Sequence, residues 1–151
     1  RGAGYLLKAL TGTINLVLPA LDPTRTPLNY AGPTGKSFVF NLVYNPSVTS
    51  DPNNGVNLIG FPFDPQKVAS ATWLSALVTW PGAPATGPDG NPWTVQTASA
   101  AGKMSSELLT IDPSNGNSIN VSDSGLVPYA GYYVTTKINN LQITIKANPL
   151  P

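Results

Sequence analysis

Residues 132–147, YYVTTKINNLQITIKA, form two runs of alternating side chains on either side of Asn139 and Asn140. The apolar face falls on even positions before the Asn pair and on odd positions after it. A two-residue turn produces this change of phase, so the pattern predicts a β-hairpin in which Ile138 lies opposite Leu141. One long strand with a bulge at the Asn pair is the alternative. In both arrangements one face is mainly apolar and the other mainly polar, as in a sheet with one side in water. The expected core face consists of Tyr132, Val134, Thr136, Ile138, Leu141, Ile143, Ile145 and Ala147.

Short runs of the same kind recur along the chain and are separated by turn residues. The clearest is residues 37–44, SFVFNLVY, which alternates strictly and is closed by an Asn-Pro pair. Asx-Pro pairs initiate turns and cannot continue a strand ladder. The other expected strands are residues 12–18, 56–63, 93–97, 107–111 and 118–122. With about eight short strands, the sequence predicts an all-β fold, an antiparallel β-sandwich that is jelly-roll-like. A small barrel is the alternative.

Residues 65–80 fit two patterns. Asp64 and Pro65 suit the start of a helix, and apolar residues follow at helical spacing. We expect a helix of about two turns from Pro65 that runs into a strand near Leu77. Residues 72–80 also alternate as a strand would. The fold should therefore contain at most one short helix.

The chain of 151 residues has only 10% charged residues and a net charge of +1. A typical soluble protein has about 25% charged residues. So weak a positive charge offers no field to hold a nucleic-acid backbone, and no apolar run reaches the ~20 residues of a membrane span. A charge-poor surface is expected of a subunit that buries much of itself against copies of itself. A secreted domain with a Ser, Thr and Asn coat is the alternative.

The residues that usually carry catalysis are missing. The chain has neither His nor Cys, which excludes Ser-His and Cys-His nucleophiles and thiolate metal sites. Four of the seven carboxylates directly precede proline, which is a turn-forming context. Residues 112–117 with Asp123 offer oxygen ligands but do not match the spacing of a calcium-binding EF-hand loop. We therefore expect no catalytic residue, no metal, no cofactor and no enzymatic activity.

Aromatic residues are the remaining candidates for a binding site. Trp80 and Trp93 flank the Pro-rich loop of residues 81–92 and are the candidates for contact with a glycan. Ordinary packing of the two rings is the competing interpretation. Asn120 begins an Asn-Val-Ser sequon, which matters only if the chain passes through a glycosylating pathway.

Residues 1–20 are expected to form an N-terminal strand or an arm between subunits, followed by a β-sandwich domain of residues 21–151. Residues 5–18 are apolar and strand-forming, and a proline-punctuated connection follows them. Such a segment can complete the sheet of a neighbouring subunit, or it can be the first strand of its own sandwich. The candidate interface residues are Tyr5, Leu7, Leu10, Ile14, Leu16 and Leu18.

The sequence thus predicts a non-enzymatic structural protein that assembles with copies of itself. In composition and strand pattern it is similar to β-sandwich subunits of extracellular filaments and pili, and to capsid, decoration or tail proteins of virions. The expected location is extracellular, on a cell surface or in a virion. The alternative function is a secreted carbohydrate-binding or adhesin module, for which glycans would be the partners. Oligomeric state separates the two.

Overall fold

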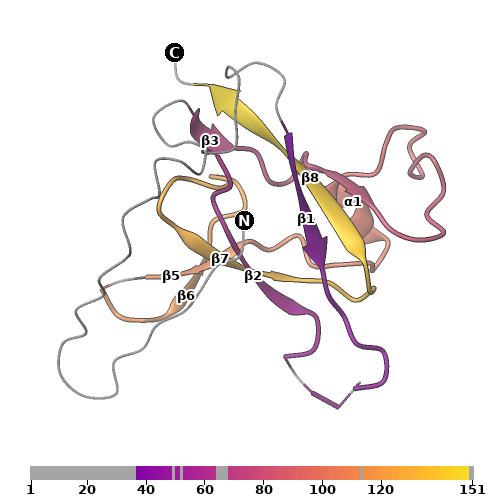
Figure 1. The fold of residues 1–151 in the computed structure, drawn as a ribbon, viewed down its shortest axis with the longest axis horizontal. Coiled ribbons are helices and arrows are strands. Elements are labelled where there is room, and N and C mark those ends of the chain that lie inside the picture. Colours follow the sequence, from indigo (N-terminus) through magenta and orange to yellow (C-terminus); the bar gives the residue numbers. More distant parts are fainter. Residues whose placement is uncertain (1–36, 49, 52, 64–67, 113, 150–151) are drawn as a thin grey trace, which may run out of the picture.

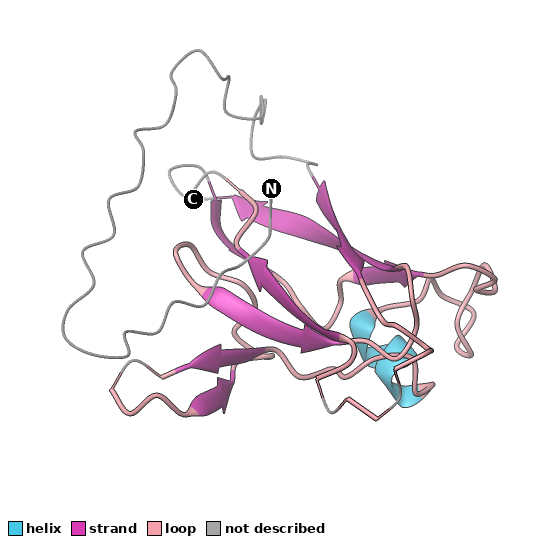
Figure 2. Cartoon of the chain, turned by 60° about the horizontal axis from the view of Figure 1, so that its bottom comes forward, coloured by secondary structure: helices cyan, strands magenta, loops and turns pink. Residues whose placement is uncertain are grey.

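The structure is a computed structural model, which describes residues 37–48, 50–51, 53–63, 68–112 and 114–149. These residues form eight strands in two antiparallel sheets, with one short helix at the side (Figures 1 and 2). The expected all-β sandwich with at most one short helix is therefore confirmed, whereas its jelly-roll connectivity stays a prediction. The elements are β1 (Ser37–Leu42), β2 (Val56–Gly60), β3 (Val68–Ala71), β4 (Leu77–Thr79), α1 (Val95–Ala100), β5 (Leu109–Ile111), β6 (Ser118–Asn120), β7 (Gly131–Thr135) and β8 (Leu141–Pro149).

The first sheet is organised around β8, its longest strand. β1 pairs with β8 over six residues without a break, from Ser37 opposite Lys146 to Leu42 opposite Leu141. On the other side of β8, β4 pairs with residues 142–144 and β3 pairs with residues 147–149. β8 is thus the central strand of this sheet.

The second sheet has the strand order β2–β7–β5–β6. β2 and β7 pair over their full length, with Ile59 opposite Tyr132 and Leu58 opposite Tyr133. β5 joins β7 at Leu109, which also lies opposite Tyr133, and forms a hairpin with β6. The alternation along β7 therefore decides which residues of this sheet face the core.

The inner faces of the two sheets pack together and form one core. Tyr132 is almost fully buried, and its hydroxyl accepts a hydrogen bond from the backbone N–H of Val127 at 2.8 Å. Burial raises the pKa of this tyrosine. Among the described residues, no buried side-chain nitrogen or oxygen lacks a hydrogen-bond partner. The buried apolar residues are Phe40, Leu42, Ile59, Phe63, Ala71, Trp73, Ala76, Val78, Val95, Ala98, Met104, Leu108, Leu126, Tyr132, Val134, Leu141, Ile143 and Ile145.

The pairing predicted for residues 132–147 is wrong, although the core face of both runs is largely correct. β7 lies in the second sheet and β8 in the first, so their apolar faces meet across the core and not side by side. Residues 136–140 form the corner between the sheets, where Thr136 N–H donates to the carbonyl of Gly55 at 2.9 Å. Ile138 is half-buried, and Leu141 pairs with Leu42 of β1. A single bulged strand is excluded for the same reason.

The prediction of a helix from Pro65 is also wrong for the residues of this segment that the structure describes, which begin at Val68. Residues 68–71 form β3, whose Ala71 pairs with Ala147 of β8 and exchanges backbone hydrogen bonds with Leu126. These tertiary hydrogen bonds outweigh the helical spacing of the apolar residues, because helix propensity is a weak preference. The strand expected near Leu77 is confirmed as β4.

The helix occurs instead at α1, where a strand over residues 93–97 was expected. Thr94 caps α1: its hydroxyl accepts from the N–H of Thr97, and the Thr97 hydroxyl accepts from the N–H of Thr94. This reciprocal arrangement satisfies two backbone donors and fixes the start of the helix. No helix in the described part of the chain is long and apolar enough to span a membrane.

Candidate functional site

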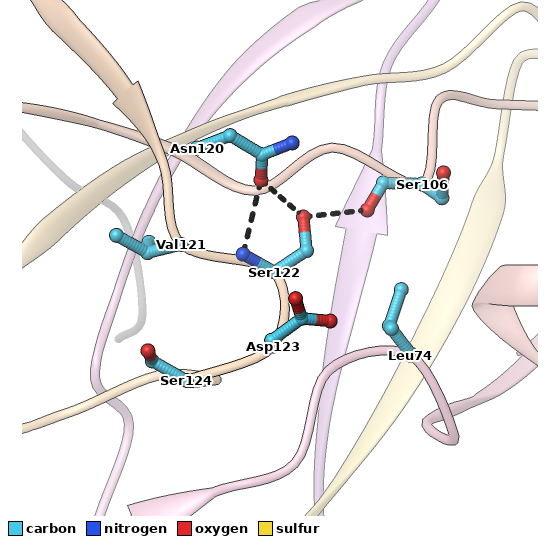
Figure 3. Close-up of a pocket in the computed structure, with 7 residues that line it drawn as sticks. All are labelled: Leu74, Ser106, Asn120, Val121, Ser122, Asp123 and Ser124. Carbon is cyan, nitrogen blue, oxygen red and sulfur yellow. Dashed lines mark hydrogen bonds between the residues drawn. The ribbon is translucent and has the colours of Figure 1, made fainter.

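The described surface contains a polar groove between two turns. One turn follows β3 and includes Leu74, and the other follows β6 at residues 121–125. Its volume is about 450 Å³, and an adjoining hollow of about 350 Å³ shares four of its lining residues. Figure 3 shows the lining, which consists of Leu74, Ser106, Asn120, Val121, Ser122, Asp123 and Ser124.

Ser122 holds the floor of this groove together. Its hydroxyl accepts from the N–H of Leu108 at 2.9 Å and lies 3.1 Å from the carbonyl of Ser106. The Asn120 side-chain oxygen accepts from both the N–H and the hydroxyl of Ser122 (Figure 3). The Ser106 carbonyl also accepts from the buried indole N–H of Trp73 at 2.7 Å. Because these bonds join β5, β6 and the turn after β3, the Ser122 hydroxyl has a structural role.

The chemistry that the groove offers is limited. Asp123 supplies the only carboxylate of the lining, and Figure 3 shows it pointing into the groove on the side of Leu74. Glycoside hydrolysis normally needs two carboxyl groups. In the described part of the chain, no three His, Cys, Asp or Glu residues lie close enough together to hold a metal ion. The groove thus offers hydroxyl and amide groups around one carboxylate.

Two acids elsewhere in the described chain, Asp89 and Asp112, lie in turns and have a lowered pKa. The Asp112 carboxylate accepts from the hydroxyl and N–H of Ser114 and from the side-chain amide of Asn115. These hydrogen bonds, that of the Ser114 hydroxyl first, hold the pKa of Asp112 below its ordinary value. The N–H of Asn91 lowers the pKa of Asp89 in the same way. The side-chain oxygens of Asp112 and Asn115, two of the residues considered for calcium, therefore already accept hydrogen bonds within the loop.

The two candidate glycan-contact residues do lie together. The Trp80 and Trp93 rings meet edge to face, with centroids 5.0 Å apart and planes at 64°. Trp93 donates its indole N–H to the carbonyl of Pro84 at 3.1 Å, which ties it to the Pro-rich loop. Both rings are half-buried and pack against the core. This geometry accounts for the pair as an anchor of the loop, and glycan contact stays a prediction.

The outer face of the second sheet is a surface that the sequence did not predict. Leu58, Tyr133 and Leu109 lie in one row across β2, β7 and β5, and Val56 and Thr135 form the next row. We call these five residues the β2–β7–β5 outer face. They point away from the core, since their neighbours Ile59, Tyr132 and Val134 are buried. None is charged, and Val56 is 39% exposed.

The outer face of the first sheet is similarly poor in charge. It consists of alternate residues of β1, β8 and β4, in rows such as Val39–Thr144–Leu77. Asn41 and Gln142 are joined by a side-chain hydrogen bond of 2.9 Å on this face. Lys146 is the only charged side chain in these paired positions. The β1–β8–β4 outer face comprises Ser37, Val39, Asn41, Leu77, Thr79, Gln142, Thr144 and Lys146.

The candidate interface residues of the N-terminal segment, from Tyr5 to Leu18, lie outside the described residues. Asn120 of the sequon is exposed at the end of β6. Comparisons of the chain with family models, curated proteins and solved structures found no match.

Proposed function

We propose that the chain is a non-enzymatic structural protein that assembles with copies of itself. It serves as a subunit of an extracellular filament or pilus, or as a capsid, decoration or tail component of a virion. The observation that carries this proposal is the near absence of charge on both outer faces of the sandwich. Charged side chains keep soluble monomers apart, and the centres of protein interfaces are depleted of them.

The β2–β7–β5 outer face is the better candidate for contact between subunits. It brings two leucines, a valine and a tyrosine onto adjacent strands, all directed away from the core. Contiguous apolar side chains on the outside of a folded domain mark interaction sites, whereas single ones are ordinary. Tyrosine is also enriched at interfaces, because its ring is apolar and its hydroxyl can stay hydrated.

The order of strand pairing supports the same function. β1 pairs with β8, β2 with β7, and β5 with β6, while Ala71 of β3 forms a bridge with Leu126. These nested pairs resemble one long hairpin wound into two sheets, which is the plan of a jelly roll. Jelly rolls occur in viral capsids and also in lectins. Fold alone does not separate these functions.

A secreted carbohydrate-binding or adhesin module is the second candidate. The hydroxyl-lined groove with its single carboxylate supports it, as does the proximity of Trp80 and Trp93. Such a module functions as a monomer whose stability rises when it binds a sugar. The oligomeric state of the full chain therefore separates the two proposals.

Introducing a charge on the β2–β7–β5 outer face should weaken assembly. For Val56→Lys and Leu58→Lys we expect association to weaken on the order of tenfold or more, because each places a charge in an apolar contact. Sedimentation velocity over a concentration series, with electron microscopy of the same samples, measures this effect.

Val48→Lys is the matched control, since Val48 is 41% exposed in a loop and Val56 is 39% exposed on the face. The control should assemble like the unchanged chain. Equal weakening by all three variants would count against this face. An unchanged chain that stays monomeric and is stabilised by a sugar would favour the carbohydrate-binding alternative.

A further inference from the structure

The edge of the first sheet formed by β1 has backbone groups without a partner in the described chain. β1 pairs with β8 on one side, and residues 37–42 make no other backbone hydrogen bond among the described residues. In an antiparallel ladder, alternate residues direct their N–H and C=O groups to opposite sides of the strand. About half of the backbone groups of β1 therefore point outward along a free edge.

This edge lacks the features that normally prevent strand addition. Natural edge strands are short, bulged, or carry a charge or proline. β1 runs for six residues in unbroken register with β8 and contains no charged residue and no proline. Of the other edge strands, β4 and β6 have three residues each, and β3 is interrupted by a register shift. β2 has five residues, and the side chain of its Asn57 bonds to the backbone of Val43.

The side chains along β1 would suit an apolar strand. Phe38 is half-buried and packs edge to face on Phe40, with centroids 4.9 Å apart. An added strand with apolar residues on its inner face would cover the exposed part of Phe38 and extend the core. On the outer face, Val39 is 43% exposed and would gain a neighbour. Strand addition gains affinity from the backbone and specificity from alternate side chains.

We propose that the free edge of β1 receives residues 12–18 of a second copy of the chain as an added strand. This inference rests on the proposed self-assembly and names the contact that produces it. Residues 12–18, GTINLVL, carry no charge and alternate Ile14, Leu16 and Leu18 on one face. That face would lie beside Phe38 and Phe40.

The connection to β1 is long enough for residues 12–18 to reach a neighbouring copy. Residues 19–36 contain Pro19, Pro23, Pro27 and Pro33. A connection of this length spans at most ~60 Å when extended, whereas a domain of this size is roughly 40 Å across.

Disulfide formation between copies tests this contact, because the full chain contains no cysteine. Thr13, Asn15 and Val17 alternate with the inward residues, so they would share the outer face with Val39. Full-length single-cysteine chains, Thr13→Cys, Asn15→Cys or Val17→Cys, are each mixed with Val39→Cys and oxidised. A disulfide needs Cα atoms about 4.4–6.8 Å apart, so only the donor position nearest Val39 should link efficiently. Non-reducing electrophoresis should show a heterodimer for that position.

The control acceptor is Thr79→Cys, which is exposed on the same outer face but at the opposite side of the sheet. It should give at least about tenfold less product than Val39→Cys, because Thr79 lies too far from the added strand. Equal linking to both acceptors would overturn the proposal. The proposal would also be overturned if a Val17→Cys/Val39→Cys double variant formed a disulfide only within one chain. A disulfide formed mainly between two Val39→Cys chains would overturn it as well. Assembly without any link to Val39 would reject this contact while leaving the proposed function in place, and a wholly monomeric chain would reject both.

Discussion

Replacing Ile143 with Ala is expected to lower the free energy of unfolding by about 2–5 kcal/mol. Ile143 lies in the middle of β8, is fully buried, and pairs with Phe40 on one side and Val78 on the other. Its side chain faces the second sheet across the core. Truncation would leave a cavity where three strands of the first sheet meet, and that site has little freedom to collapse. Urea denaturation followed by tryptophan fluorescence measures the loss.

Thr144→Ala is the control for this substitution. Thr144 is the next residue of β8 and lies on the outer face between Val39 and Leu77. In the monomer its replacement should cost about 0.5 kcal/mol or less, as for surface positions in general. Equal costs at low protein concentration would contradict the face assignment. A cost for Thr144→Ala that rises with protein concentration would instead indicate that assembly covers this face.

The alternation of side chains predicted which residues are buried but not which strands pair. Tyr132, Val134, Leu141 and Ile143 are buried as expected. The same alternation is compatible with two strands that pair side by side and with two that face each other across a core. The choice depends on Thr136, whose N–H bonds to Gly55 far away in the sequence. This contact between distant residues cannot be predicted from the local sequence.

Short elements were the least predictable part of the fold. α1 has six residues, too few for helical periodicity to become visible, and its start depends on the Thr94 and Thr97 cap. Those two residues at a spacing of three were a signal in the sequence, although Thr replaces the usual Glu or Gln of a capping box. β5 and β6 lie within their predicted segments but are shorter, because their ends bend away into loops.

The candidate surfaces could be predicted only in part. The proximity of Trp80 and Trp93 follows from their positions at the two ends of one loop. The polar groove joins Leu74, Ser106 and Ser122, and the β2–β7–β5 outer face joins residues from three separate strands. The residues of each of these two surfaces can be grouped only when the strand order is known. The low content of charge, in contrast, was visible in the composition.

Replacing Gly55 with Ala is expected to destabilise the fold by about 3 kcal/mol or more. Gly55 has a φ of 85°, which L-residues rarely adopt. A Cβ atom there would also collide with the carbonyl oxygen of Thr136 and approach the ring of Tyr44. Since Gly55 accepts the hydrogen bond from Thr136 N–H, relieving the collision would displace the corner between β7 and β8.

Gly116→Ala separates the collision from the backbone conformation. Gly116 has a similar φ of 74°, but a Cβ there would meet no atom within 4 Å. We therefore expect it to cost only about 1 kcal/mol, the strain of a left-handed conformation alone. Urea denaturation of both variants, each monitored by fluorescence and circular dichroism, gives the comparison. If both substitutions cost the same, the contact with Thr136 does not constrain the fold. A larger cost at Gly55 would show that the close approach of Gly55 to Thr136 contributes to the stability of this corner.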